Sequence, residues 1–442
     1  MGLAGAVKRA ATRVTINQIL GLIDSSDANL LRILRAIKLV SPLEWYDKGL
    51  AKMEEFLEKG HPGIEGVRRA IRAMSKIARK KFVENFVMGT FLEGHHRRYD
   101  FYEKEGFGPP TTLLISPTTV CNLRCYGCYA EGHDVHNTLP FAVMDRVIGE
   151  AKAAGTSWVQ FVGGEPFLVK DLWKVFESHP DVHFNVFTNA TLLSDADIDR
   201  LAQMGHVALS VSVEGLQAHT DERRGRGIWA QATGTMRKLA ERGVPVAFSA
   251  TYSKANFDMI GTGPFFDAMM DAGCIFGWFF PLMPVGSCAV PQLMLTPYQK
   301  LQLKDRLAQM RREKPILFFD FGHDEWLAGG CMAARKLIHV NSQGGVEPCM
   351  FTQYAVDNIT NKSYAEVLRS KFLGGVRDDG RIRKDPTKTC LVTEVPEVFR
   401  EIVATGNASN QSGDTVTTTL APVVDAYARA LRELDRPPAG NP

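Results

Sequence analysis

Six short apolar runs alternate with amphipathic segments through the middle of the chain, and this alternation constrains the fold more than any other feature. The runs occupy residues 112–118, 158–164, 184–190, 207–214, 246–253 and 275–284. They are apolar on both faces and are separated by helical stretches of about ten or more residues, a pattern typical of parallel strands joined by right-handed crossovers. The pattern therefore predicts an α/β fold, and the count favours an incomplete (β/α)6 barrel.

The segments on either side of this barrel have different patterns. Residues 1–108 show helical periodicity and almost no strand pattern, and the Gly- and Pro-rich stretch 105–110 separates them from the barrel at 109–315. Residues 316–404 contain a predicted β-hairpin with a Gly-rich turn, followed by a helix. Residues 405–442 are predicted to form a linker rich in Asn, Ser, Gly and Thr and a last amphipathic helix.

Composition narrows the possible functions. Lys and Arg number 52 against 49 Asp and Glu, and the net charge of +3 gives no global reason to expect a nucleic-acid partner. Hydrophobic residues make up 45 %, as in ordinary globular proteins. The basic amino terminus lacks an apolar stretch with a cleavage site, and the longest uncharged span, 272–299, is broken by prolines. We therefore expect a cytoplasmic protein.

Eight cysteines are too few for a disulfide framework in a chain of this length, and their grouping indicates metal ligation in a reducing compartment. Cys121, Cys125 and Cys128 form a C-x3-C-x2-C loop directly after the first apolar run, at the strand end where parallel sheets carry their chemistry. Three thiolates on one loop can bind three irons of a [4Fe-4S] cluster and leave the fourth iron without a protein ligand. A zinc knuckle and a closed iron–sulfur electron carrier are the alternatives.

This spacing after the first strand resembles the cluster loop of the radical S-adenosylmethionine (SAM) superfamily. Residues 163–166, Gly-Gly-Glu-Pro, match the family motif that contacts the methionyl amino group of SAM. By the same resemblance, SAM-binding residues are expected at consecutive strand ends, namely Gly163, Gly164, Glu165, Thr188, Asn189, Ser212, Glu214 and Arg224. One position departs from the family pattern, because Gly127 stands where members often carry an aromatic residue near the adenine.

The resemblance implies an enzyme whose reduced [4Fe-4S] cluster cleaves SAM, so that the resulting radical abstracts hydrogen from an unactivated carbon. In such an enzyme the protein positions the reactants and excludes water and oxygen, and no acid–base triad is required. An electron donor such as flavodoxin or ferredoxin is an expected partner. We assign no catalytic residue beyond the cofactor ligands.

A second iron–sulfur site is indicated by Cys331, Cys349 and Cys390. The C-x12-G-x4-C spacing that begins at Cys331 resembles the opening of the SPASM extension or its shortened "twitch" form, in which a hairpin and a helix hold an auxiliary [4Fe-4S] cluster. Because Cys390 stands alone, a single twitch-type cluster is expected. Cys288 is the candidate fourth ligand, and Cys274 is expected in the core. The alternative is three unrelated buried thiols.

A basic amphipathic stretch at 68–81 gives the only indication of the substrate. Its Arg and Lys side chains can lie on the anionic inner face of a membrane. This possibility favours a membrane-lipid substrate and radical C–C bond formation, as in the tetraether and membrane-spanning lipid synthases that the chain generally resembles. The alternatives are a peptide maturase that forms thioether or carbon crosslinks and a non-catalytic iron–sulfur or zinc protein. A helix packed on the barrel with a solvated basic face explains the stretch equally well.

Overall fold

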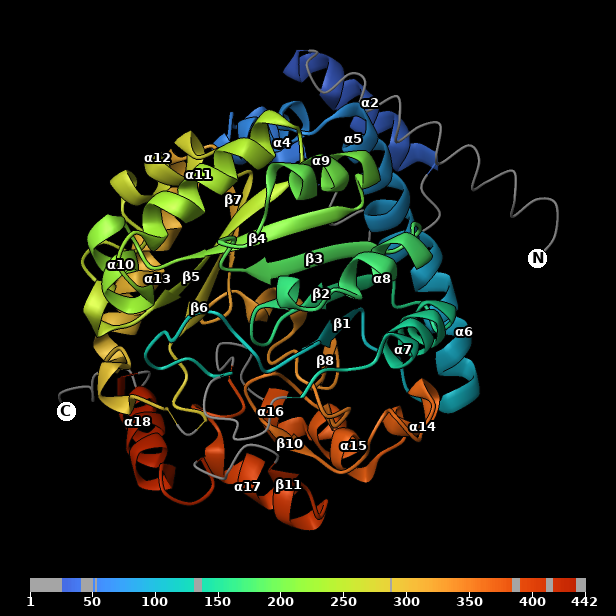
Figure 1. Ribbon diagram of the computed structural model, residues 1–442, viewed down its shortest axis with the longest axis vertical. Coiled ribbons are helices and arrows are strands. Elements are labelled where there is room, and N and C mark those ends of the chain that lie inside the picture. Colours follow the sequence, from blue (N-terminus) through green and yellow to red (C-terminus); the bar gives the residue numbers. More distant parts are fainter. Residues whose placement is uncertain are drawn as a thin grey trace, which may run out of the picture.

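The computed structural model describes residues 26–40, 51, 54–130, 137–286, 288–383, 390–410 and 416–434. The first 25 residues of the predicted N-terminal helical region and residues 411–415 of the predicted linker lie outside these ranges. The described elements surround one central sheet (Figure 1).

This sheet has nine strands in the order β7-β6-β5-β4-β3-β2-β1-β8-β9. All neighbouring pairs are parallel except β8 and β9, which are antiparallel. The six predicted runs form β1 to β6 in chain order, which confirms the α/β fold and an open, partial barrel. The strands are β1 (Thr112–Ile115), β2 (Trp158–Phe161), β3 (His183–Thr188), β4 (Val207–Val213), β5 (Val246–Tyr252), β6 (Phe276–Pro281), β7 (Leu317–Asp320), β8 (Leu337–Val340) and β9 (Val346–Glu347).

Three strands, β7, β8 and β9, extend the sheet beyond the six predicted units. β7 pairs in parallel with β6 at one edge, and β8 pairs in parallel with β1 at the other. The predicted hairpin is confirmed as β8 and β9, and its turn contains Gly344 at a φ of +85°. The C-terminal extension therefore begins as a continuation of the barrel sheet.

The two faces of the sheet carry different side chains. In β6, Phe279 packs into the main core, whereas Trp278 and Phe280 belong to a separate apolar cluster on the other face, as the two-residue period of a strand requires. The helices that run along the outside of the sheet are α7 (Phe141–Ala153), α8 (Leu172–Ser178), α9 (Asp195–Met204), α10 (Gln217–Arg224), α11 (Ile228–Glu241), α12 (Gly263–Asp271) and α13 (Pro297–Glu313) (Figure 1). The inner face is consequently rich in aromatic rings.

The N-terminal helices pack at the amino ends of the strands. They are α2 (Asp27–Val40), α4 (Pro62–Ala73), α5 (Lys76–Lys81), the π-helix η1 (Phe82–Glu93) and α6 (Gly94–Glu105). The Asn85 amide donates to the carbonyls of Pro180 and Val182, just before β3, at 3.0 Å each. Arg98 Nη1 donates to the Gly155 carbonyl, just before β2, at 2.6 Å. The arrow of β3 accordingly points away from these helices (Figure 1).

The basic stretch 68–81 takes part in this packing. Arg69 Nη2 donates to the Met270 carbonyl at 3.1 Å, and Lys81 Nζ donates to the Pro180 carbonyl at 2.8 Å. These contacts favour the simpler interpretation of the stretch, a helix packed on the barrel. Among the described residues, no helix is both long and apolar enough to cross a membrane.

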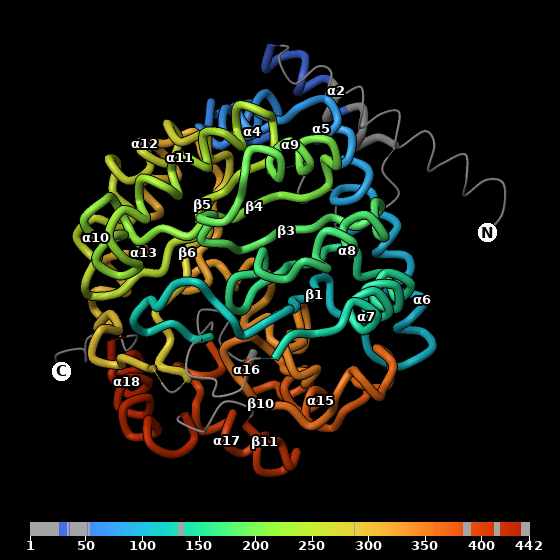
Figure 2. The backbone as a smooth tube through the Cα atoms, in the orientation of Figure 1, coloured from blue at the N-terminus to red at the C-terminus, as the bar shows by residue number. Residues whose placement is uncertain are grey.

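The C-terminal extension lies along the side of the molecule opposite α2, α4 and α5 (Figure 2). After β9 it contains β10 (Tyr354–Ala355), α14 (Tyr364–Leu368), α15 (Lys371–Asp378), α16 (Gly380–Arg383), α17 (Pro396–Thr405), β11 (Ser409–Asn410) and α18 (Ala421–Leu434). β10 and β11 form a short antiparallel pair, so the start of the predicted linker is partly a strand. α18 packs against α13 and α17, which attaches the last helix to the barrel.

Candidate active site

A cavity of about 610 Å³ lies at the carboxyl ends of the barrel strands, and Cys121, Cys125 and Cys128 line it from the loop after β1. The other predicted residues that line this cavity are Gly163, Gly164, Glu165, Thr188, Asn189, Ser212 and Arg224. The fold thus brings the predicted strand-end residues to the rim that carries the cysteine loop.

The two glycines after β2 allow the cysteine loop to approach. The Gly164 amide donates to the Thr118 carbonyl at 3.0 Å, and a Cβ at Gly164 would lie 2.1 Å from the Val120 carbonyl oxygen. Gly163 has a φ of +101°, in the region that favours glycine. The local backbone therefore requires glycine at both positions. This structural requirement is separate from the predicted contact of these residues with SAM.

Glu165 ties the ends of β2 and β3 together. Its carboxylate accepts hydrogen bonds from Thr188 Oγ1 at 2.7 Å, from the Asn189 amide at 2.9 Å and from the Phe167 amide at 3.1 Å. The side chain is almost fully buried, and burial raises the pKa of Glu165 while these donors oppose the rise. Both carboxylate oxygens of Glu165 thus hold the ends of β2 and β3 in place.

An amide network extends from Glu165 to the first cysteine. Asn189 Nδ2 donates to Asn122 Oδ1 at 2.8 Å and lies 3.9 Å from Cys121 Sγ. Asn122 in turn donates to Thr191 Oγ1 at 2.8 Å. Ala190, between these polar residues, has a φ of +58°, which is uncommon for a residue other than glycine. The predicted Asn189 therefore fixes the orientation of the cysteine loop.

Two arginines at the end of α10 hold the other side of the loop. Arg224 Nε donates to Glu214 Oε1 at 2.8 Å, and its Nη1 lies 4.0 Å from Cys125 Sγ. Arg223 Nη1 lies 2.8 Å from the same Glu214 oxygen, and its Nε donates to the Tyr126 carbonyl at 3.2 Å. Burial alone would lower the pKa of Arg224, but the Glu214 carboxylate raises it above its usual range. Arg223 is absent from the sequence-based prediction, although its position beside Arg224 in the sequence was a usable signal.

The packing around Gly127 explains why an aromatic residue does not occupy this position. It has a φ of +64°, and a Cβ there would lie 2.5 Å from Val290 Cγ2 and 3.2 Å from Leu282 Cδ1. Residues that follow β6 therefore fill the space where a larger side chain at 127 would lie.

Much of the remaining lining of the cavity is apolar. It is formed by Phe187, Phe280, Leu282, Met283, Met350 and Phe351. Ser249 and Thr251 on β5 line the cavity beside Ser212, and sequence reasoning missed both. Such a wall suits an apolar reacting group next to a polar cofactor.

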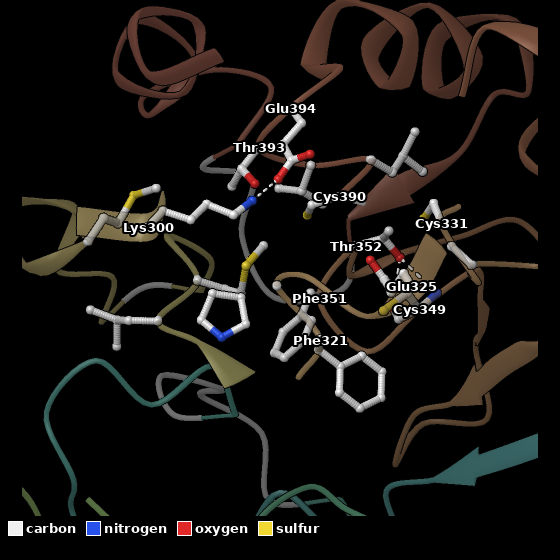
Figure 3. Close-up of a pocket in the computed structure, with 18 of the residues that line it drawn as sticks. Lys300, Phe321, Glu325, Cys331, Cys349, Phe351, Thr352, Cys390, Thr393 and Glu394 are labelled. Carbon is white, nitrogen blue, oxygen red and sulfur yellow. Dashed lines mark hydrogen bonds and ion pairs between the residues drawn. The ribbon is translucent and has the colours of Figure 1, made fainter. Parts of the chain in front are cut away.

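A second, smaller cavity of about 60 Å³ is lined by Cys331, Cys349 and Cys390 (Figure 3). These cysteines come from three separate segments, after β7, after β9 and before α17. One water needs about 10–15 Å³ of such space, so the cavity can hold a group of several atoms. The fold thus brings together the three cysteines that the spacing predicted as a set.

The two cavities share one wall. Pro281, Leu282, Met283 and Phe351 line both of them. Tyr129, which follows the third loop cysteine, also links the two regions, since its hydroxyl accepts from the Gly163 amide at 3.2 Å and its ring packs against Phe351 at 5.4 Å between centroids.

The two remaining cysteines lie apart from the second set. Cys288, the candidate fourth ligand, lines the first cavity with Cys121, Cys125 and Cys128 and is absent from the described lining of the second. Cys274 is completely buried, with its sulfur 3.7 Å from the sulfur of Met236, in the core as expected.

The donor sets fit iron–sulfur chemistry. Iron–sulfur clusters are held by soft sulfur ligands, and each set of three cysteines lines the wall of one cavity. Among the described residues, no three His, Cys, Asp or Glu side chains converge as the ligands of a single metal ion would. Burial raises the pKa of Cys121 to about 11 and that of Cys390 to about 11, so metal binding has to displace thiol protons.

Two protein-family models match the chain: the radical SAM superfamily over residues 115–260, and the SPASM iron–sulfur cluster-binding domain over residues 331–391. The sporulation killing factor maturation protein SkfB of Bacillus subtilis is 24 % identical over 266 residues, which are 58 % of this chain and 64 % of SkfB. The AdoMet-dependent heme synthase of Methanosarcina barkeri is 25 % identical over 58 % of this chain and 82 % of that protein.

Among solved structures, Streptococcus suis SuiB bound to precursor peptide SuiA matches with a TM-score of 0.54 and 19 % identity, over 65 % of this chain and 71 % of that chain. At 19 % sequence identity, this structural similarity shows the fold alone. The match to SkfB spans less than two thirds of SkfB's length.

Proposed function

The chain belongs to the radical SAM superfamily and carries a SPASM domain, and we propose that it is an enzyme that forms a thioether or carbon crosslink in a peptide. The observation that carries this proposal is the arrangement of the cysteines. Two sets of three line adjoining cavities that share an apolar wall at the carboxyl ends of the strands.

The first set provides the site for SAM. Cys121, Cys125 and Cys128 would hold a [4Fe-4S] cluster with one iron left for SAM. When bound, the cluster and SAM supply one-electron chemistry that removes hydrogen from an unactivated carbon. Arg223 and Arg224 hold the loop and place positive charge beside it.

The strand-end residues divide into those that contact SAM and those that support it. Thr188, Asn189 and Ser212 line the cavity and remain proposed SAM contacts, as do the backbones of Gly163 and Gly164. Ser249 and Thr251 add two further hydroxyls that can bind SAM or substrate.

Glu165 and Glu214 act through their neighbours. Glu165 fixes Thr188 and Asn189, and Glu214 fixes Arg224. Both carboxylates therefore hold residues of the site in place, and Glu165, which itself lines the cavity, remains a proposed SAM contact as well.

The second set would hold the auxiliary cluster. Cys331, Cys349 and Cys390 line a small cavity behind the shared apolar wall, which keeps water away from a bound cluster. We propose that a flavodoxin or ferredoxin reduces the enzyme. Residues of the shared wall would separate the auxiliary cluster from the reacting substrate.

A peptide substrate has more support than a lipid. SkfB is a maturation protein, and SuiB has been solved with a precursor peptide. The lipid prediction depends on the stretch 68–81, which packs at the amino ends of the strands, whereas the first cavity lies at their carboxyl ends. A tetrapyrrole is the competing substrate class, because the match to the heme synthase spans 82 % of that protein.

The test is a product assay with the full chain, reconstituted anaerobically with iron, sulfide, SAM and a reductant. Candidate substrates are peptides encoded beside the gene, a membrane lipid extract and an iron porphyrin. We expect 5'-deoxyadenosine and a peptide that has lost two hydrogen atoms per crosslink, measured by mass spectrometry. An unchanged peptide together with C–C coupling in the lipid extract, or with a converted porphyrin, would overturn the peptide assignment.

A further inference from the structure

A hydrogen-bonded chain of three buried side chains joins the C-terminal extension to the end of β1. His339 on β8 lies between the other two members of the chain, Ser116 after β1 and Glu347 on β9. Its Nε2 is 2.7 Å from Ser116 Oγ, and its Nδ1 is 2.8 Å from Glu347 Oε2. All three residues are buried. The chain therefore connects two residues of the extension to a residue of the barrel.

The carboxylate of Glu347 sets the direction of these hydrogen bonds. A carboxylate oxygen accepts, so the neutral His339 ring carries its proton on Nδ1 and donates it to Glu347, while Nε2 accepts from the Ser116 hydroxyl. The Asn341 amide donates to the other oxygen of Glu347 at 2.7 Å, and Asn341 Oδ1 accepts from the Gly345 amide at 2.9 Å. The hairpin turn thus fixes Glu347, and Glu347 fixes the His339 ring.

The Ser116 end of the chain packs against Gly163. A Cβ at Gly163 would lie 2.8 Å from Ser116 Cβ and 2.9 Å from Ser116 Oγ. The Ser116 amide also donates to the Val340 carbonyl of β8 at 2.9 Å. Gly163 lines the first cavity, whereas Ser116 is absent from the described lining of that cavity. Ser116 therefore supports Gly163 from outside the space proposed for SAM.

A second contact from the extension reaches the same glycine. Gln353 Nε2 donates to the Tyr129 carbonyl at 2.8 Å, and the Tyr129 hydroxyl accepts from the Gly163 amide at 3.2 Å. Ser116, His339, Gly163, Tyr129 and Gln353 all line a third cavity of about 40 Å³ at this junction. The extension thus holds Gly163 through two barrel residues, Ser116 and Tyr129.

A Ser-His-Glu chain is also the arrangement of an activated serine nucleophile. The space around Ser116 does not suit that role. One water needs about 10–15 Å³ of such space, so the third cavity has room for about three waters, too little for an acyl group and the water that would hydrolyse it. Gly163 also lies directly against the Ser116 hydroxyl. The chain is therefore built to hold the glycine turn.

We propose that Ser116, His339 and Glu347 are positioning residues that hold the Gly163 backbone for SAM binding. The inference rests on the proposed contact between Gly163 and SAM. A buried polar group that loses its partner costs free energy, so the removal of one member disturbs the whole chain. The extension then contributes to SAM binding at the first cavity, although its own cysteines line the second.

The test measures the dissociation constant of SAM by isothermal titration, with the full chain reconstituted anaerobically and its iron and sulfide counted. Ser116→Ala removes the hydroxyl that packs against Gly163, and we expect the dissociation constant to rise about tenfold. Ser210→Ala is the matched control, because Ser210 is also buried on a strand and donates to a side chain, Asn185 Oδ1, at 2.8 Å. The control should bind SAM like the parent, even if both variants lose the same stability.

A second variant removes the rest of the chain and leaves Ser116 in place. His339→Leu/Glu347→Gln buries no unpaired charge, since the new amide at 347 can still pair with Asn341. We expect weaker SAM binding here as well. Because the three residues act as one unit, adding Ser116→Ala to this variant should weaken binding no further, whereas independent effects would multiply to about a hundredfold.

The inference is overturned if Ser116→Ala binds SAM like the parent, if Ser210→Ala weakens binding equally, or if the two changes multiply. If Ser116→Ala does not fold, His339→Leu/Glu347→Gln decides: weaker binding at full iron content supports the chain, and unchanged binding overturns it. A parent that holds both clusters and does not bind SAM would instead overturn the proposed SAM site itself, and the inference with it.

Discussion

The two cysteine cavities differ in size and in what surrounds them. The first has about 610 Å³ and is lined by hydroxyl, amide and arginine side chains as well as by aromatic side chains. The second has about 60 Å³, and its described lining includes the three cysteines, Glu325 and the Lys300–Glu394 pair. A space of the first size suits a nucleoside cofactor and part of a substrate, whereas the second suits a cluster alone.

This difference supports the proposal that the two cysteine sets have separate roles. The first loop is held by Arg223, Arg224 and Asn189, which themselves line the first cavity. The second set lies between barrel residues such as Leu282 and Met283 and residues of the extension such as Tyr427 of α18.

Replacing Cys331, Cys349 and Cys390 together by Ala should abolish the crosslinked product and leave SAM cleavage measurable. The reason is that these thiols lie behind the wall formed by Leu282 and Met283, outside the first cavity. Mass spectrometry of the peptide and chromatography of 5'-deoxyadenosine provide the two measurements. Product formation at the parent rate would show that the second set has no part in the reaction.

Gly164→Ala should deplete iron at the first site and leave the auxiliary iron in place. The new Cβ would lie 2.1 Å from the Val120 carbonyl oxygen, so the loop must move, at a cost of about 1–3 kcal/mol. Gly149→Ala is the control, because a Cβ at this position in α7 meets nothing within 4 Å. The control should be neutral or stabilised by about 0.5–1 kcal/mol. Full iron content in Gly164→Ala would contradict the packing explanation.

Arg224→Met should lower the free energy of unfolding by about 2–3 kcal/mol, because Glu214 loses a charged hydrogen-bond donor in a buried position. Arg223 still pairs with Glu214, which limits the loss. Denaturant unfolding measures the change, and the exposed Arg226→Met should stay within about 0.5 kcal/mol. Equal losses of stability in both variants would contradict a structural role of the Arg224–Glu214 pair.

Lys76→Gln/Lys80→Gln should have the smallest effect. Both lysines are exposed on α5, at the end of the barrel opposite the cavities, so we expect less than about 0.5 kcal/mol change in stability and unchanged product yield. Thermal unfolding and the peptide assay check this. Loss of product that anionic vesicles restore would revive the membrane-lipid prediction.

The strands and the cysteine loop were predictable because their signals are local. Alternating runs identify β1 to β6, and C-x3-C-x2-C identifies the loop. The spacing of Cys331 and Cys349 likewise identifies the matched SPASM domain.

Contacts between distant segments were not predictable from these patterns. Nothing local shows that β8 pairs with β1, that Arg223 reaches the Tyr126 carbonyl, or that Cys390 lines one cavity with Cys331. The charge of 68–81 suggested a membrane surface, whereas Lys81 donates to a barrel carbonyl. Sequence patterns identify the chemical groups that the chain carries, but the contacts between those groups depend on how distant segments pack.

The yield of 5'-deoxyadenosine from SAM tests the central claim most directly. The full chain is reconstituted anaerobically and compared with its Cys121→Ala/Cys125→Ala/Cys128→Ala variant and with Cys274→Ala, a change to a buried core thiol. We predict steady formation in the parent and in Cys274→Ala and background formation in the triple variant. Equal yields in the parent and the triple variant, or none in the parent, would contradict the assignment of the first cavity as the site of SAM cleavage.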